Sequence, residues 1–247
     1  MEEYERFTRT TSLKRLFRRG FLKLNRWFFG KQVQRKIIGV QYIPVSRAYI
    51  IASAPHQSHI DTGFILFAIF QAFGREKVNR LMPLAARDHF FRQILWGLWG
   101  QFWNATTNAF PFARRGKGSL KSIEHACRLI KQGYSVLIFP EGGRQKREEE
   151  GWSIGEFKSG VGEIALRTGA PVIPCLIEGT GELLPKGKGR LLPFAWRALL
   201  GSTKKNTVRL TFGRPIYPVH MREIGAYTAK EITNVVRETL QDLENRT

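Results

Sequence analysis

The segment Ala54-Pro-His-Gln-Ser-His-Ile-Asp61 places an imidazole and a carboxylate five positions apart. On one continuous helix the two side chains could not meet, because residues five apart are rotated by about 140° from each other. They can meet if His56 lies in the loop that leaves a strand and Asp61 lies in the first turn of the next helix. The carboxylate would then accept the N–H of the imidazole, fix its tautomer and leave the other ring nitrogen free as a base.

A histidine held in this way can carry out acid–base catalysis. It needs no serine or cysteine nucleophile if the attacking group belongs to the substrate, and a lipid hydroxyl is such a group. Both His56 and His59 are candidates for the base. The alternative is a loop histidine beside a helix cap, with no catalytic role.

The segment Phe139-Pro-Glu-Gly-Gly-Arg144 follows a predicted strand, and ligands gather at the carboxyl ends of strands in open α/β sheets. Gly142 and Gly143 allow the backbone to approach an anion closely, and Arg144 can bind a phosphate with two hydrogen bonds. Glu141 could hold this arginine or accept a hydrogen bond from substrate. A plain Gly-Gly turn with a surface salt bridge is the alternative.

A third candidate segment, Ala109-Phe-Pro-Phe-Ala-Arg-Arg115, comes just before a predicted helix. Arg114, Arg115 and Lys117 would lie near the N-terminus of that helix, which favours an anion. Solvated basic loop residues are the alternative. Three candidate anion-binding or acid–base segments thus occur at successive loops of one pattern.

The elements that must position these residues alternate between strands and helices. Apolar runs predict strands at 47–53, 134–139 and 171–177, and helical periodicity predicts helices at 63–73, 119–133 and 156–168. This alternation indicates an α/β domain with a mostly parallel twisted sheet covered on both faces. A half-exposed strand is expected at 207–212, and a last helix should begin after an N-cap at Thr228 with Glu231 at N3.

Together these segments resemble the glycerolipid acyltransferase family that includes lysophosphatidic acid acyltransferases. His56 to Asp61 is similar to its His-x4-Asp block, Phe110 to Arg114 to its arginine block, and Phe139 to Arg144 to its Phe-Pro-Glu-Gly block. Phe157-Lys-Ser-Gly160 and Ala170-Pro-Val-Ile-Pro174 resemble two later blocks in the right order. The resemblance covers residues 38–220 and implies a glycerol-3-phosphate acyltransferase-like α/β fold.

The resemblance implies that His56 is the base, that Asp61 orients it, and that a further set binds the acceptor phosphate: Arg114, Glu141, Gly142, Gly143 and Arg144. The secondary candidates are Ser58, Arg115, Lys117 and Lys158. The implied reaction moves a fatty acyl group from acyl-CoA or acyl carrier protein to the sn-2 hydroxyl of lysophosphatidic acid, without a metal or other cofactor. Ala54-Pro55 replaces a common Asn and Gly143 a common Thr. Glycerol 3-phosphate or another lysolipid therefore stays open as the acceptor.

Residues 12–31 predict a basic helix with an apolar stripe at three- and four-residue spacing. The stripe consists of Leu13, Leu16, Phe17, Phe21, Leu24, Trp27 and Phe28. Such a helix suits an anionic lipid interface, where rings are buried and cations meet headgroups. An ordinary surface helix packed on the core is the alternative. We expect residues 1–37 to form a membrane-interface segment and residues 38–247 the catalytic domain.

The composition narrows the class of protein. The net charge of +20 should attract an anionic membrane, ligand or polymer. The two cysteines lie in apolar segments, and no cleavable signal or apolar run of about 20 residues is evident. We expect a peripheral or monotopic protein on the cytoplasmic face of the inner (plasma) membrane. A nucleic-acid-binding protein and a non-catalytic lipid-binding protein are alternatives, but no recognisable nucleic-acid-binding signature is present.

Overall fold

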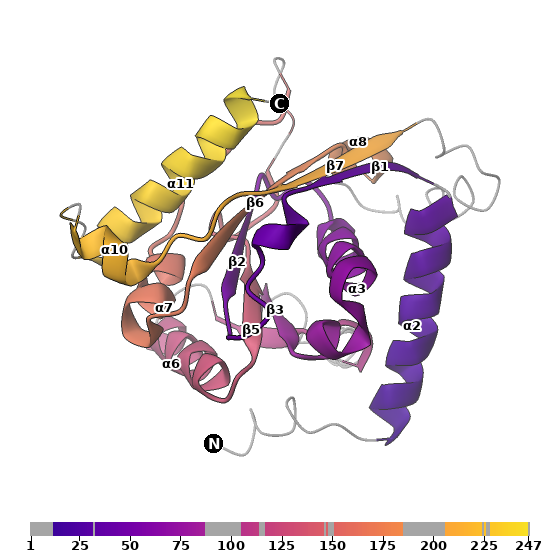
Figure 1. Ribbon diagram of the computed structural model, residues 1–247, viewed down its shortest axis with the longest axis horizontal. Coiled ribbons are helices and arrows are strands. Elements are labelled where there is room, and N and C mark those ends of the chain that lie inside the picture. The colour runs from indigo at the N-terminus through magenta and orange to yellow at the C-terminus, as the bar shows by residue number, and fades with distance from the viewer. Residues whose placement is uncertain are drawn as a thin grey trace.

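The fold is seen in a computed structural model that describes residues 12–31, 33–86, 105–113, 117–145, 147, 151–184, 206–223, 225 and 228–246. A sheet in the middle of the molecule is covered by helices on both faces (Figure 1). The expected α/β class with a mostly parallel sheet is confirmed. Among the described residues, no helix is both long and apolar enough to cross a membrane.

The sheet has seven strands in the order β1-β7-β6-β2-β5-β3-β4. The strands are β1 (Gln34–Ile38), β2 (Ile50–Ala54), β3 (Leu81–Ala86), β4 (Phe110–Phe112), β5 (Ser135–Ile138), β6 (Val172–Glu178) and β7 (Thr207–Phe212). All neighbouring pairs run parallel except β6 and β7. The carboxyl ends of β2, β3 and β5 therefore meet at one edge, where ligands gather in open α/β sheets.

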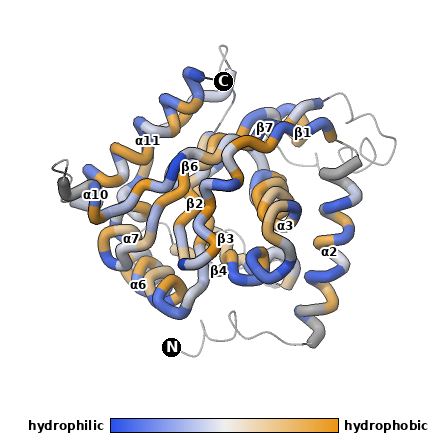
Figure 2. Tube along the Cα trace, in the orientation of Figure 1, coloured by the Kyte–Doolittle hydropathy of each residue, from blue (hydrophilic) through white to orange (hydrophobic). Residues whose placement is uncertain are grey.

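Helices cover the two faces unequally. The helical elements are α2 (Ser12–Lys31), η1 (Val40–Tyr42), α3 (Asp61–Asn79), α6 (Lys117–Lys131), α7 (Gly160–Thr168), α8 (Thr180–Leu183), α10 (Pro218–Glu223) and α11 (Ala229–Asn245). Figure 1 shows α6, α7 and α11 on one side of the sheet and α3 on the other, with α2 standing outside α3. Because α3 lies between α2 and the sheet, its early turns are apolar (Figure 2).

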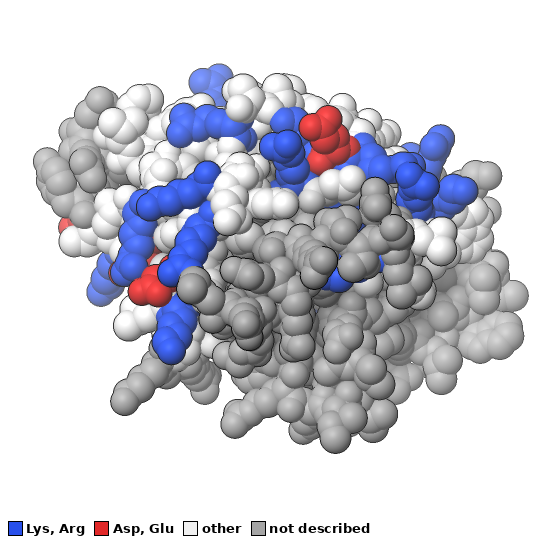
Figure 3. All heavy atoms as spheres, turned by 90° about the horizontal axis from the view of Figure 1, so that it is seen from below, with Lys and Arg blue, Asp and Glu red and all other residues white. Residues whose placement is uncertain are grey.

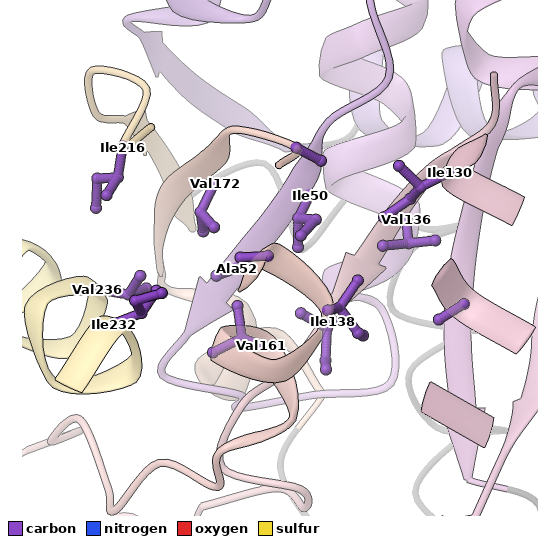
Figure 4. Close-up of a cluster of buried hydrophobic side chains, with 14 of the residues drawn as sticks. Ile50, Ala52, Ile130, Val136, Ile138, Val161, Val172, Ile216, Ile232 and Val236 are labelled. Atoms are coloured by element: carbon purple, nitrogen blue, oxygen red, sulfur yellow. The ribbon is translucent and has the colours of Figure 1, made fainter. Parts of the chain in front are cut away.

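The central strands are buried on both faces, so their sequences read as continuous apolar runs. In β2, Ile50 and Ala52 belong to the core cluster on the side of α6, α7 and α11, together with Val136 of β5, Val161 of α7 and Val236 of α11 (Figure 4). Ile51, between them, belongs to the second cluster, which includes α3. Successive side chains of β2 therefore point to opposite faces of the sheet.

Most predicted elements are confirmed, but several bounds differ: the helix expected at 63–73 runs from Asp61 to Asn79, and the strand expected from residue 47 begins at Ile50. Thr228 and Glu231 form the expected capping box, and the strand at 207–212 has the predicted bounds. The helix expected from residue 156 begins only at Gly160. The backbone N–H of Lys158 donates to the carbonyl of Pro140 at 2.9 Å, so this segment is held as a loop instead.

Candidate active site

The predicted pair lies where β2 passes into α3. β2 ends at Ala54 and α3 begins at Asp61, so His56 lies in the connecting loop. Nδ1 of His56 is 2.8 Å from Oδ2 of Asp61. The Asp61 side chain is fully buried, whereas 17% of the His56 side chain is exposed. The contact expected from the spacing is therefore present, and the imidazole remains accessible.

The same oxygen of Asp61 is held by the backbone of the loop. Oδ2 also accepts the N–H groups of Gln57 at 2.9 Å and Ser58 at 3.0 Å. An ionised carboxylate only accepts hydrogen bonds, so Nδ1 of His56 carries the proton and Nε2 is left to act as a base. The loop thus orients both the acid and the imidazole.

The loop is anchored to the segment around α8. The side-chain oxygen of Gln57 accepts hydrogen bonds from the Thr180 hydroxyl at 3.2 Å and the Gly181 N–H at 3.1 Å. The Ser58 hydroxyl donates to the carbonyl of Leu184 at 2.8 Å. Ser58 is fully buried and does not line the cavity beside His56, so its hydroxyl serves this anchor.

The imidazole plane is fixed by Phe139 at the end of β5. The two rings stack with their centroids 3.9 Å apart and their planes inclined by 19°. The strand pattern predicted where Phe139 lies along the chain but not this contact. The stack restricts the His56 ring, which must hold one orientation to transfer a proton efficiently.

A cavity of about 460 Å³ lies at the carboxyl ends of β2 and β5, beside His56. Its polar lining includes His56, His59, Thr62, Arg144, Lys158 and Ser159. Its apolar lining includes Leu84, Phe112, Ile123, Ile138 and Phe139. Cations and an imidazole beside an apolar wall suit a substrate with an anionic group and a hydrocarbon chain.

Gly142 and Lys158 approach each other closely at this cavity. Gly142 adopts a left-handed conformation with φ of 70°, which favours glycine. A Cβ atom at this position would lie 2.8 Å from Nζ of Lys158. The glycine therefore allows both the turn and the approach of the lysine.

Arg144 also lines the cavity, and it interacts electrostatically with Asp61. Burial lowers the pKa of Arg144, and the negative charge of Asp61 acts in the opposite direction. A guanidinium stays charged in proteins even when it is partly buried. Arg144 therefore brings a permanent positive charge to the cavity.

Sequence comparison places this architecture among known proteins. A family model described as Acyltransferase matches residues 34–178. The chain belongs to this acyltransferase family. The matched span contains His56, Asp61 and the Phe139–Arg144 segment. The family resemblance predicted from the ordered motifs is therefore confirmed.

Several acyltransferases are similar to the chain. The chloroplastic 1-acyl-sn-glycerol-3-phosphate acyltransferase BAT2 of Brassica napus is 33% identical over 182 residues, covering 73% of this chain and 44% of the relative. A probable 1-acyl-sn-glycerol-3-phosphate acyltransferase of Mycoplasma pneumoniae is 23% identical over 226 residues, covering 91% and 77%. The chain thus spans less than half the length of the Brassica relative.

A solved acyltransferase structure has the same fold. The crystal structure of the 1-acyl-sn-glycerophosphate acyltransferase PlsC from Thermotoga maritima matches with a TM-score of 0.60 at 22% sequence identity. The match covers 91% of this chain and 77% of the PlsC chain. This likeness supports the sheet order and helix layers described above.

The acyltransferase cavity gathers many of the predicted residues but not all of them. His56, Gly142, Gly143, Arg144 and Lys158 line it. His59 lines it too, and His56 is the histidine whose Nδ1 lies 2.8 Å from Oδ2 of Asp61. The predicted Arg114 and Arg115 lie outside the described residues, as do the side chains of Lys117, Leu13 and Phe28.

Within the described ranges, no three His, Cys, Asp or Glu residues are placed to hold a metal ion. The side chains that line the cavity offer proton transfer by His56 and charge stabilisation by Arg144 and Lys158.

Proposed function

We propose that the chain transfers a fatty acyl group from an acyl thioester to the sn-2 hydroxyl of lysophosphatidic acid, which yields phosphatidic acid. The observation that carries the proposal is a carboxylate-oriented His56 in a cavity that also holds Arg144 and Lys158. The names of the Brassica and Mycoplasma relatives support this acceptor.

The reaction needs one proton transfer in each direction. Nε2 of His56 removes the proton of the acceptor hydroxyl while the oxygen attacks the thioester carbonyl carbon. A C–O bond forms, the tetrahedral intermediate collapses, and the C–S bond breaks. The imidazolium returns the proton to the leaving thiolate, so His56 ends the cycle neutral. Asp61 stabilises the imidazolium between the two steps.

Binding of the acceptor phosphate is assigned to the cations near the base. Arg144 and Lys158 line the same cavity as His56, and Gly142 and Gly143 provide small residues beside them. Charge-assisted hydrogen bonds from these side chains would place the phosphate at one end of the acceptor. The apolar wall that includes Ile123 and Ile138 would then contact hydrocarbon.

The acyl donor is proposed to be acyl-CoA or an acyl carrier protein thioester. Both carriers are anionic, as is the acceptor, and the chain carries a net charge of +20. On the face drawn in Figure 3, Lys and Arg side chains gather in two areas with only isolated acidic side chains among them. Such a surface attracts anionic partners and speeds encounter.

We also propose that α2 lies on an anionic lipid surface. Leu16, Phe17, Leu24 and Trp27 are 66%, 47%, 59% and 37% exposed. At about 100° per residue they fall within an arc of about 100° on the helix. Leu22, which is buried, projects from the opposite side. The apolar stripe therefore faces away from the rest of the described protein.

Exposed cations lie along one side of this stripe, and they indicate which kind of surface the stripe binds. Arg19, Lys23 and Arg26 are exposed and fall on one side of the stripe. Arg18, on the inner side, donates instead to the carbonyl of Val78 in α3. Bulky apolar residues beside cations fit the boundary between lipid headgroups and acyl chains. A membrane location at the cytoplasmic face would also deliver the lipid acceptor.

A thiol-release assay tests the proposal. Purified protein is mixed with vesicles and with acyl-CoA or acyl carrier protein thioester, and lysophosphatidic acid, glycerol 3-phosphate, larger lysophospholipids and monoacylglycerol are compared as acceptors. We expect thiol release that depends on lysophosphatidic acid and a matching yield of phosphatidic acid by mass spectrometry. Faster turnover of another acceptor would reassign the substrate, and no release with any pair would overturn the enzymatic proposal.

A further inference from the structure

We propose that Glu141 is a positioning residue, which holds the backbone of His56 in place and does not contact the acceptor phosphate. This inference rests on the acyl transfer proposed above, and it gives Glu141 a different role from the one implied by the family resemblance. It follows from where the carboxylate points and from what its two oxygens accept.

Both oxygens of Glu141 accept backbone hydrogen bonds. Oε2 accepts the N–H of His56 at 2.7 Å, and Oε1 accepts the N–H of Gly155 at 2.9 Å. Glu141 is 7% exposed, so these bonds are shielded from solvent. One buried side chain thereby ties the β2–α3 loop to the loop before α7.

The orientation of Glu141 differs from that of its neighbours. Pro140, Gly142, Gly143 and Arg144 line the cavity, whereas Glu141 does not. The side chain therefore leaves the cavity wall and turns into the protein. A carboxylate turned toward a phosphate would repel it, so the inward orientation also removes an unfavourable interaction.

The segment that carries Glu141 also binds the backbone carbonyl of His56. The N–H of Gln145 donates to the carbonyl of His56 at 2.7 Å. Glu141 and Gln145 thus bind the N–H and the carbonyl of one residue, while Phe139 stacks on its ring. The chain from 139 to 145 fixes the catalytic residue at three points.

The charge of Glu141 supports the same role. Burial raises the pKa of Glu141, while the N–H groups of His56 and Gly155 lower it, as does the charge of His56 itself. The hydrogen bonds that lower this pKa are the same ones that hold the two loops, so the charged carboxylate is the form that binds the backbone of His56 most strongly.

Glu141→Gln is the informative substitution because it preserves size and leaves only one oxygen. The amide nitrogen would face a backbone N–H, so one of the two hydrogen bonds is lost in either orientation. Glu182→Gln is the matched control. Glu182 lies in α8, outside the cavity lining, and binds Trp152 and Arg147 at the surface.

The experiment measures kcat and the acceptor KM of wild type, E141Q and E182Q by thiol release, with lysophosphatidic acid and with monoacylglycerol. We expect E141Q to lose kcat by about 10²-fold with an acceptor KM within about twofold of wild type, since small misplacements of a catalytic group cost about this much. The loss should be equal for both acceptors, because monoacylglycerol has no phosphate. E182Q should match wild type.

Four results would overturn the inference. An increase of KM for lysophosphatidic acid alone would assign Glu141 to phosphate binding, and unchanged kcat would remove it from positioning. If E141Q fails to unfold cooperatively, E141D replaces it in the test. Aspartate keeps the charge but withdraws both oxygens from the two backbone N–H groups. An effect of E141D on the acceptor KM without an effect on kcat would count against positioning. A wild-type protein without thiol release would overturn the proposed function and this inference together.

Discussion

Nδ1 of His56 and Oδ2 of Asp61 lie 2.8 Å apart although the two residues belong to different elements, a loop and a helix. The contact exists because the loop turns back on the first turn of α3, where two backbone N–H groups bind the same carboxylate oxygen. The loop backbone therefore holds the carboxylate that the imidazole contacts, so Asp61 is as informative a target as His56.

Asp61→Asn should lower kcat by at least about 10²-fold, near the low end for loss of effective acid–base catalysis. The amide carries no charge to stabilise the imidazolium, and its nitrogen can force the wrong imidazole tautomer. The acceptor KM should change little, since Asp61 does not line the cavity. Asp242→Asn, at an exposed position of α11, is the control. Equal activity of both variants would exclude Asp61 from the mechanism.

Lys158→Met should raise the KM for lysophosphatidic acid by about tenfold. A hydrogen bond to a charged group contributes about 1.5–3 kcal/mol, and about 1.4 kcal/mol corresponds to a factor of ten. Steady-state kinetics with lysophosphatidic acid and monoacylglycerol check this. Lys131→Met, at an exposed position in the last turn of α6, should have no effect. The same loss with both acceptors would show that Lys158 does not bind the phosphate.

The paired substitution Leu16→Ser and Leu24→Ser should reduce binding to anionic vesicles by at least about tenfold. Full burial of one large apolar side chain in lipid contributes about 1.5–3 kcal/mol to binding, and about half of that energy is enough for the expected tenfold loss. Co-sedimentation with vesicles measures the partition. Leu120→Ser with Val219→Ser, at exposed apolar positions of α6 and α10, is the control pair. If the control pair loses as much binding, the α2 stripe is not the lipid-binding surface.

The buried Glu141 should make stability depend on pH. Its pKa in the folded protein is raised above the ordinary value of 4.5. Between that value and the raised pKa, the folded protein keeps a proton that the unfolded chain has released, so stability falls as the pH rises. The free energy of unfolding of wild type, minus that of E141Q, should therefore decrease from pH 4 toward neutrality. Urea unfolding of both proteins measures it, and a constant difference would contradict the shift.

The sequence predicted those features that depend on residues close to one another along the chain. The capping box of Thr228 and Glu231 and the left-handed Gly169 that ends α7 are set by neighbours in sequence. The meeting of His56 and Asp61 also followed from spacing, because it spans one loop. Such features need no knowledge of the rest of the chain.

Strands that depend on distant partners were missed. β3 has the sequence Leu-Met-Pro-Leu-Ala-Ala, which lacks β-branched residues, and it forms because β5 and β4 pair with it. β4 has only three residues and contains Pro111, which an edge strand tolerates. β1 is a largely exposed, basic edge strand beside β7. Tertiary pairing decides all three.

Beyond the His56–Asp61 pair, the contacts between residues of the site were not predicted from the sequence. The Glu141 carboxylate accepts the N–H of a residue 85 positions away, and no local pattern reveals that direction. The stack of Phe139 on His56 is hidden for the same reason. Residues 1–11, 87–104 and 185–205 lie outside the described structure, and the division of the chain at residue 37 stays a prediction.

Thiol release by purified His56→Ala protein tests the central claim, that this imidazole is the base for acyl transfer. With lysophosphatidic acid and acyl thioester at saturation, we expect a folded, vesicle-bound variant whose kcat is at least about 10²-fold below wild type. His59→Ala, which changes the other histidine of the cavity, should retain most of the activity. Undiminished turnover by His56→Ala, or loss confined to His59→Ala, would contradict the mechanism.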